Sequence, residues 1–319
     1  MLLAFLAGLG GGNFSSFMPS TSLFFPKRLQ GTALAIQAGI GNFGVSIVQF
    51  VTPWIIGFAL MGGAAFMGDS QTLTKAGVQS QVYLQNAAAV MIPFTFVFGV
   101  SAWLMLKSVP VKANFAQQFD IFRSRHTWSM TSLYVMTFGA FSGLAATFPL
   151  LIKQIYGGFE GAPDPLAWAF WGPLVGSAAR VVAGPLSDKL GGARVTHWAG
   201  LGMLGATLWV TTLTSPTGLD SFPMFVAGML TMFFFAGVGN ASTFKQMPML
   251  FEPRQAGGVI GFTAAIAAYG PFLFGMLFAA SFGAFKSATP VFYGLAAFSA
   301  FNVVLNWWMY ARRGAANPC

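Results

Sequence analysis

One arginine in this sequence stands where its charge needs a partner. Arg180 lies inside the apolar run 166–187, two helical turns and about 12 Å before Asp188. An arginine inside a bilayer costs at least about 2.5–3.5 kcal/mol on insertion scales, so it is expected to have both a function and a partner. The planar guanidinium can donate to two oxygens at once, which suits a planar oxyanion. Arg180 is therefore the first candidate for an anion-binding residue.

The titratable residues predict how this charge is balanced. All seven acidic residues fall at the ends of apolar runs or in loops: Asp69, Asp120, Glu160, Asp164, Asp188, Asp220 and Glu252. The counter-ion of Arg180 is then the substrate or an acid outside this sequence, unless the side chain snorkels to the interface. His126 and His197 also lie near the ends of runs. This pattern favours anion exchange, with proton symport as the second hypothesis.

Polar and aromatic residues in other runs could complete such a site. Asn42 and Asn240 carry amides that need partners when buried and that can donate to an anion. Tyr134 and Phe138 are four residues apart and share one helix face. Phe14 lies in the first run. Because the chain has 36 Phe, most of which must pack against lipid or core, the pattern alone leaves these rings open between packing and binding.

The composition predicts the elements that must hold these residues. Hydrophobic residues make up 55% of the 319 residues and charged residues 7%, against about 25% charged in soluble proteins. A membrane span needs about 20 apolar residues. Nine runs qualify: 2–23, 33–60, 83–106, 128–151, 166–187, 195–214, 222–244, 256–283 and 289–310. The sequence therefore predicts an all-α integral membrane protein rather than a soluble one with a large helical core.

The charges predict how the spans are oriented. Twelve Lys and Arg fall on one side of the predicted spans: Lys27, Arg28, Lys107, Lys112, Arg123, Arg125, Lys189, Arg194, Lys245, Arg254, Arg312 and Arg313. Only Lys75, Lys153 and Lys286 fall in the alternate loops. The positive-inside rule makes the richer side cytoplasmic, together with the C-terminus. The net charge of +9 is thus explained by topology, and nucleic-acid binding is not expected.

An internal repeat predicts the architecture. The run at residues 12–17 recurs at residues 239–244, an offset of 227 (239 − 12 = 227). The same offset relates Pro26 to Pro253, Lys27 to Arg254 and Gly31 to Gly258. The copies fall in the first and seventh spans, so the repeat unit is six spans long and parallel, as in transporters built of two six-helix halves.

This repeat assigns a place to each segment. Residues 1–107 are the last three helices of the N-terminal half, 108–127 the cytoplasmic loop between halves, and 128–319 a complete six-helix C-terminal half. The sequence would then hold nine of twelve transmembrane helices, without the first three. Within the spans, the glycine pattern at 39–44 matches dinucleotide-binding loops, but that fingerprint requires a preceding strand. In an apolar helix the glycines instead indicate close helix packing.

Two glycine-rich runs resemble the nitrate/nitrite porters of the major facilitator superfamily. They are Gly10-Gly-Gly-Asn13-Phe14-Ser-Ser through Gly39-Ile-Gly41-Asn42-Phe-Gly44, and Gly237-Val-Gly-Asn240-Ala-Ser-Thr-Phe-Lys245 through Tyr269-Gly270. The resemblance covers essentially the whole chain. It implies a helical bundle of two halves in which two arginines, one from each half, hold a planar anion between aromatic rings.

The resemblance assigns roles to residues that match the motifs. Arg180 matches the arginine of the second half, while its partner belongs to a span outside this sequence. Phe14 and Phe138 match the rings around the anion, and Tyr134 and Asn42 match its polar contacts. The signature residues Gly39, Asn240 and Thr263 are expected nearby, Thr263 beside Ala264, where a hydroxyl is usual. Asp188 and Lys189 resemble the superfamily's cytoplasmic gating loop.

These observations predict a nitrate/nitrite transporter of the inner (plasma) membrane that works by alternating access, most simply as an antiporter. The alternatives are a proton-coupled nitrate symporter, a porter for another anion, and a truncated remnant that does not transport. An enzyme is not expected, because no nucleophile–base pair or paired carboxylates fall in the spans. No cofactor or metal is expected, and Cys319 is the single cysteine. The predicted partners are nitrate, nitrite and the lipid bilayer, and the protein is expected to be a monomer.

Overall fold

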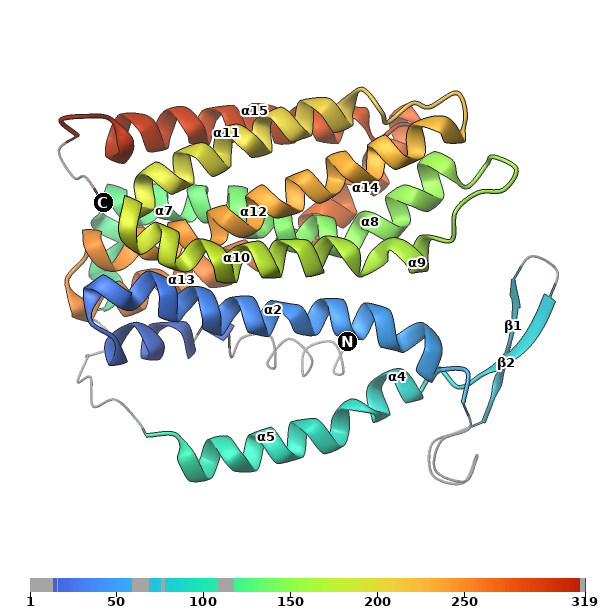
Figure 1. Cartoon of the computed structure of the whole chain (residues 1–319), viewed down its shortest axis with the longest axis horizontal. Coiled ribbons are helices and arrows are strands. Elements are labelled where there is room, and N and C mark those ends of the chain that lie inside the picture. Colours follow the sequence, from blue (N-terminus) through green and yellow to red (C-terminus); the bar gives the residue numbers. More distant parts are fainter. Residues whose placement is uncertain (1–13, 16, 59–68, 76–77, 108–117, 316–318) are drawn as a thin grey trace.

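The computed structural model describes residues 14–15, 17–58, 69–75, 78–107, 118–315 and 319, and every structural statement below concerns this part of the chain. Long helices run side by side along one direction (Figure 1). The α-helices are α2 (Gln30–Ile55), α4 (Asn86–Ala89), α5 (Met91–Met105), α7 (Arg125–Tyr134), α8 (Ala140–Tyr156), α9 (Pro165–Ala169), α10 (Trp171–Leu190), α11 (Gly192–Thr211), α12 (Phe222–Leu250), α13 (Pro253–Ala267), α14 (Gly270–Phe285) and α15 (Thr289–Asn306). Short 3-10 or π turns are η1 (Lys27–Leu29), η3 (Phe119–Arg123), η4 (Val135–Gly139), η5 (Leu219–Ser221) and η6 (Trp307–Ala311).

Seven helical stretches of the described chain are long and apolar enough to cross a membrane. They are Lys27–Ile55, Asn86–Met105, Arg125–Tyr156, Pro165–Leu190, Leu219–Leu250, Pro253–Phe285 and Thr289–Ala311. Each coincides with a predicted run. The run at 2–23 lies largely outside the described residues, and the run at 195–214 forms α11, whose first turns carry polar side chains. The protein is thus a multi-pass helical membrane protein, and the number nine stays a prediction.

A small hairpin differs from the all-helical prediction. Strand β1 (Gln71–Lys75) pairs antiparallel with β2 (Val78–Val82), and Leu73 lies opposite Ser80. The hairpin projects beyond the helices at one end of the molecule (Figure 1). Its alternating Thr, Val, Gln and Ser residues suit a strand. Open strand edges need water, so the hairpin can form outside the hydrocarbon, where the sequence predicted a loop.

Helix α12 lies at the centre of the C-terminal helices. It packs against α10 on one side and α11 on the other, and α2 packs against α10 (Figure 1). Buried aromatic rings fill the core between α8 and α12, where Phe148 contacts Phe225 and Phe233 with ring centroids 6.4 and 5.9 Å apart. The fold thereby places α2, α7, α10 and α12 around a common interior.

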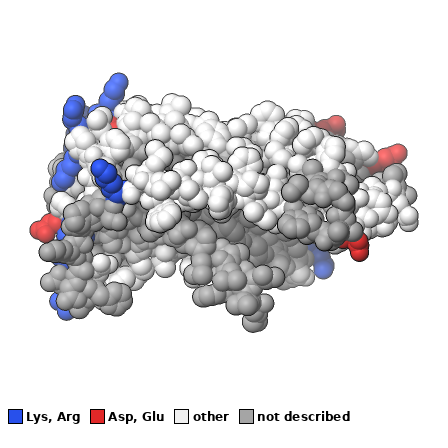
Figure 2. Space-filling view, turned by 90° about the horizontal axis from the view of Figure 1, so that it is seen from below, with Lys and Arg blue, Asp and Glu red and all other residues white. Residues whose placement is uncertain are grey.

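The charged side chains confirm that the two ends of the bundle differ. Lys and Arg gather mainly at one end, and most acidic residues that this view shows lie at the other (Figure 2). At the basic end, η3 docks on the start of α13, because Asp120 pairs with Arg254 and accepts a 3.1 Å hydrogen bond from Gln255. The hydrogen bond from Arg254 lowers the pKa of the Asp120 carboxyl, so this contact persists until strongly acidic pH.

Candidate anion-binding site

Arg180 is fully buried within the bundle, and the polar groups that hold it are neutral. Its Nη2 donates to the hydroxyl of Tyr134 on α7 at 3.2 Å. Its Nη1 donates to the side-chain oxygen of Asn42 on α2 at 3.1 Å, with the Asn42 amide turned so that its nitrogen donates to Ala38. Three helices from distant parts of the sequence therefore converge on one guanidinium.

Parallel aromatic rings surround this guanidinium. Its central carbon lies 5.8 Å from the ring centroid of Phe138 and 5.2 Å from that of Phe244. Tyr134 stacks on Phe244 at 4.3 Å and on Phe138 at 5.2 Å, with interplanar angles of 16° and 6°. Phe14 stacks on Phe138 at 5.6 Å and 6°. The ring faces attract the cation and form flat walls beside it.

Several buried polar atoms at this level have no described hydrogen-bond partner. They are Nε of Arg180, Oγ of Ser177, and both amide atoms of Asn240. All three residues are 0% exposed. Buried polar groups in native proteins are nearly always paired, so a cluster of unpaired donors and acceptors indicates a missing partner. A small anion is one species that would accept from Arg180 and Asn240 together.

Close packing of α10 and α12 brings Asn240 to the level of Arg180. A Cβ added to Gly237 would lie only 2.0 Å from the Gly176 carbonyl oxygen, so the two backbones touch there. Asn240 follows Gly237 by about one turn, and Phe244, which contacts Arg180, follows Asn240 by about another. Asn240 therefore lies between a backbone contact with α10 and a side-chain contact with the guanidinium.

The other two predicted site residues lie in helix contacts. A Cβ at Gly39 would lie 2.6 Å from Cγ2 of Val181 and 3.2 Å from the Ser177 carbonyl oxygen, so Gly39 lets α2 approach α10. Thr263 of α13 is buried, and its hydroxyl shares a 3.0 Å hydrogen bond with that of Thr131 on α7. Gly39 therefore sets how closely α2 approaches α10, and Thr263 links α13 to α7.

A polar junction ties α2 to α10 and α12 at the basic end. Asp188 accepts hydrogen bonds from the backbone nitrogens of Gly31 and Thr32 at 3.1 and 2.7 Å, and from the Thr32 hydroxyl at 2.7 Å. Lys245 pairs with Asp188 at 2.7 Å and donates to the Lys27 carbonyl at 2.5 Å. The Asp188 carboxylate thus satisfies free N–H groups at the start of α2, where the helix dipole also favours a negative charge.

Two residues at these positions were missed from the sequence. Lys189, predicted as a gating residue, is exposed, and the buried cation of the junction is Lys245, to which the sequence assigned a cytoplasmic position and a place in the second glycine-rich run but no role in gating. Phe244 was not predicted as a site residue, because the chain has 36 phenylalanines. Its position four residues after Asn240, on the same helix face, was the available signal.

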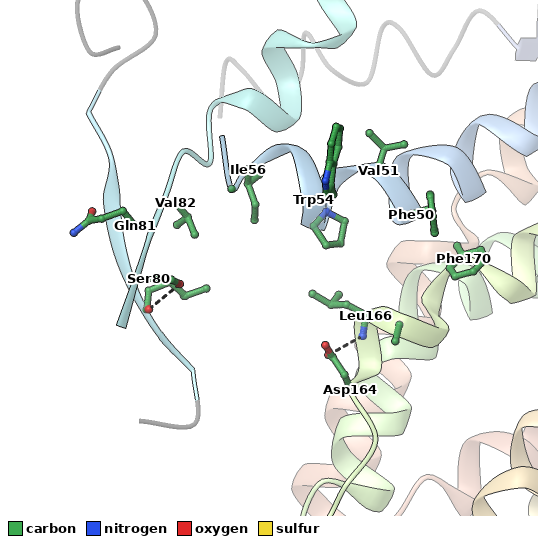
Figure 3. A pocket seen from close by; sticks show the side chains of 14 residues that line it. Phe50, Val51, Trp54, Ile56, Ser80, Gln81, Val82, Asp164, Leu166 and Phe170 are labelled. Carbon is green, nitrogen blue, oxygen red and sulfur yellow. Dashed lines mark hydrogen bonds between the residues drawn. The ribbon is translucent and has the colours of Figure 1, made fainter. Parts of the chain in front are cut away.

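A cavity of about 1130 Å³ lies away from Arg180, at the end of the molecule that carries the hairpin (Figure 3). It is bounded by the end of α2, the hairpin and α9, and its lining shares no residue with the site around Arg180. In the described chain, no three His, Cys, Asp or Glu side chains are grouped so that they could hold a metal ion.

Comparison with known proteins identifies relatives of this chain. No family model matches the chain. It is 65% identical over 320 residues to the probable nitrate/nitrite antiporter NarK2 of Thermus thermophilus, covering 100% of this chain and 72% of that protein. It is 33% identical over 339 residues to the nitrate/nitrite transporter NarU of Escherichia coli, covering 98% and 71%.

Solved structures agree on the fold. The fucose:proton symporter FucP of E. coli, a major facilitator transporter, superimposes with a TM-score of 0.67 over 92% of this chain and 72% of that chain, at 12% identity. At 12% identity, this structural similarity shows the fold alone. Taken with the relatives, which are of high identity, it establishes that the chain belongs to the nitrate/nitrite porter family of the major facilitator superfamily.

Proposed function

We propose that this protein exchanges nitrate for nitrite across the bacterial inner membrane by alternating access. The observation that carries the proposal is the setting of Arg180, a fully buried cation whose described polar partners, Tyr134 and Asn42, are neutral. A bound anion stabilises such a charge, and a guanidinium matches planar oxyanions. The relatives named as nitrate/nitrite transporters supply the identity of that anion.

In this proposal the anion lies beside the guanidinium and between flat ring faces. Phe14, Phe138 and Phe244 supply the faces, and the unpaired amide of Asn240 and the amide of Asn42 supply polar contacts. Gly39 and Thr263 act by fixing how closely the helices around the site approach. The unpaired Nε of Arg180 and Oγ of Ser177 support the proposal, since both gain a partner when an anion or its water enters.

In the proposed carrier, the two halves of the transporter rock about this site. Residues 1–107 and 128–319 belong to its two halves, joined by the loop 108–127, and the chain contributes nine of twelve helices. The contact between Asp188 and the start of α2 closes the cytoplasmic end and must separate when that end opens. Lys189 lies exposed beside it, at the water boundary. The carrier works as a monomer with a cytoplasmic C-terminus.

Exchange is favoured over proton symport by where the histidines lie. His126 lies in the first turn of α7, where its ring hydrogen-bonds the Tyr310 hydroxyl, and His197 lies in the second turn of α11; neither has a described contact with the side chains at the level of Arg180. In the described spans, the tyrosine and amides at that level remain neutral at physiological pH. Proton-coupled nitrate symport is the second candidate.

Uptake of labelled nitrate into proteoliposomes tests the proposal. Vesicles are loaded with nitrite or left empty, with and without an inward proton gradient. We expect uptake that requires internal nitrite, ignores the gradient and is lost in Arg180→Lys, because an ammonium cannot reproduce the planar fork. Arg194→Lys, an exposed position on α11, is the matched control and keeps activity.

Each other result assigns a different function. Gradient-driven uptake into empty vesicles would establish proton symport. Competition by larger anions as strong as that by nitrite would indicate a porter for another anion. A folded protein that binds nitrate but moves none would be a remnant that does not transport.

A further inference from the structure

A groove between α14 and α15 opens on the side of the bundle that faces lipid. It measures about 480 Å³, and the two helices form its long walls. Helix α15 lies at the edge of the bundle in Figure 1. Helix α14 is apolar along its whole length, yet only Gly270, Phe278 and Ser281 of its residues are buried. A helix that is apolar on all sides and mostly exposed is stable in hydrocarbon rather than in water.

The lining of this groove offers almost only apolar contacts. Leu273, Leu277 and Phe285 of the α14 wall are 46%, 52% and 66% exposed. Ser281 has the one polar side chain among the described lining residues, and its hydroxyl already donates to the Ser287 carbonyl at 2.6 Å. A contiguous apolar surface of this kind suits an acyl chain.

The length of the groove matches one leaflet of a bilayer. The α14 wall runs from Leu273 to Phe285, which is twelve residues (285 − 273 = 12) and about 18 Å along the helix. Half of a hydrocarbon core of about 30 Å is about 15 Å. The inner end of the groove reaches Val135 and Ala140, at the turn η4 that follows Tyr134. An acyl chain that enters from the loop end can therefore fill the groove within a single leaflet.

A lysine lies at the loop end of the groove. Lys286 follows Phe285 directly and belongs to the loop that joins the two walls. Its side chain is exposed, and no carboxylate of the described chain forms an ion pair with it. Its φ of 54° lies in the left-handed region, where helices usually end in Gly or Asn. An ammonium at this place can meet the phosphate of a lipid whose chain lies in the groove.

We propose that the groove between α14 and α15 binds an anionic phospholipid, such as phosphatidylglycerol. One acyl chain lies against Leu277 and Gly294, and the headgroup phosphate pairs with Lys286. In the orientation that the positive-inside rule predicts, this lipid belongs to the outer leaflet.

Native mass spectrometry of the delipidated protein, titrated with phosphatidylglycerol or with phosphatidylethanolamine of the same acyl chains, tests this site. We expect saturable binding, with phosphatidylglycerol preferred by about two- to fivefold, the range of an exposed ion pair. Lys286→Asn should abolish the preference, because it removes the charge while Asn tolerates the left-handed backbone. Lys153→Asn, in the last turn of α8, is the matched control. It removes a lysine that does not adjoin the lining, so the preference should stay.

A second variant tests the groove itself. Gly294 belongs to the α15 wall, and a Cβ added there meets nothing within 4 Å, so the side chain of Gly294→Leu extends into the groove. It should abolish saturable binding of both lipids without lowering the melting temperature, because leucine is the better helix former. Gly283→Leu is the matched control. A Cβ at Gly283 of α14 also meets nothing within 4 Å, but this residue does not line the groove, so both lipids should bind as to the wild type.

Several results would overturn the proposal. They are equal binding of the two lipids by the wild type, a preference for phosphatidylethanolamine, and a preference that survives Lys286→Asn or is lost equally in Lys153→Asn. Binding that Gly294→Leu leaves intact, or that Gly283→Leu removes as completely, would also overturn it. The readout needs no nitrate, so it is independent of the transport assay.

Discussion

At the scale of single residues, the site is a cation held by neutral groups. Tyr134 is uncharged. Its hydroxyl accepts a hydrogen bond from one nitrogen of the Arg180 guanidinium, and its ring stacks on Phe138 and on Phe244. The same residue therefore orients the cation and shapes the wall. These two roles can be separated, since removing the hydroxyl leaves the ring in place.

Tyr134→Phe is expected to raise the KM for nitrate at least about tenfold, with little change in the maximal exchange rate. The lost hydrogen bond involves a charged group and is worth about 1.5–3 kcal/mol, and the freed guanidinium must then be ordered by the substrate. Initial rates of exchange over a range of nitrate concentrations give both constants. Tyr156→Phe is the control, because it removes a hydroxyl that bonds Leu213 and Ser221 at the outer end. Equal KM values in the two variants would contradict the role.

Residue type and spacing could predict some of the residues around Arg180 but not others. Arg180 could be predicted because a charge inside an apolar run is rare, and Asn42 and Tyr134 follow from polarity or helix spacing. Phe244, one of 36 phenylalanines, was not predicted, although its position one helical turn after Asn240 was a signal; the fold then places its ring against the guanidinium. The partner of Asp188 was equally hidden, since only packing shows that Lys245 turns inward.

At the scale of elements, small residues bring α2 and α10 close together. Gly39 faces Val181 and Ser177, and nearer the basic end Gly184 of α10 faces Ala35 of α2, where an added Cβ would lie 2.6 Å from the Ala35 Cβ. Small residues let helices approach where lipid gives no hydrophobic drive for association. This contact also carries Asn42 to Arg180.

Gly39→Ala should therefore destabilise the protein, whereas Gly41→Ala on the same helix should be neutral or stabilising. The Gly39 methyl would meet Val181 and backbone, an overpacking that costs about 1–3 kcal/mol. A Cβ at Gly41 meets nothing within 4 Å, and alanine is the better helix former. Melting temperatures in detergent compare the two. A Gly41→Ala loss as large as that of Gly39→Ala would show that the contact is not responsible.

Most helices could be predicted because long apolar runs have few alternatives in a membrane. The breaks between consecutive helices were not predicted. The break between α13, which ends at Ala267, and α14 is marked by Gly270 and Pro271, although the run 256–283 was predicted as one span. The π turn η4 between α7 and α8 is marked by neither a proline nor a polar run, and it depends on which neighbours accept the freed backbone groups in the packed bundle.

At the scale of the whole molecule, charge orients the bundle. Lys and Arg gather at the end where α10 finishes and α2 begins, and the hairpin lies at the opposite end (Figures 1 and 2). The positive-inside rule then predicts that Arg194 faces the cytoplasm and that Lys153, in the last turn of α8, faces outward.

This orientation can be read by labelling. In a Cys319→Ser background, Lys153→Cys should react with a membrane-impermeant maleimide on intact spheroplasts, and Arg194→Cys should react only after the membrane is permeabilised. Both wild-type side chains lie on the exposed surface, so accessibility does not bias the comparison. The reverse pattern would invert the proposed topology and place the hairpin cavity on the inner leaflet.

The stoichiometry of the proposed exchange also sets how the carrier responds to the membrane potential. Because Arg180 returns to its starting position in each cycle and one monovalent anion crosses in each direction, a complete nitrate–nitrite cycle moves no net charge across the bilayer. The potential then contributes nothing to the driving force, whereas moving one uncompensated charge across 100 mV is worth about 2.3 kcal/mol. An electrically silent exchanger of this kind follows only the two concentration ratios, and it runs at the same equilibrium in an energised cell and in a depolarised one.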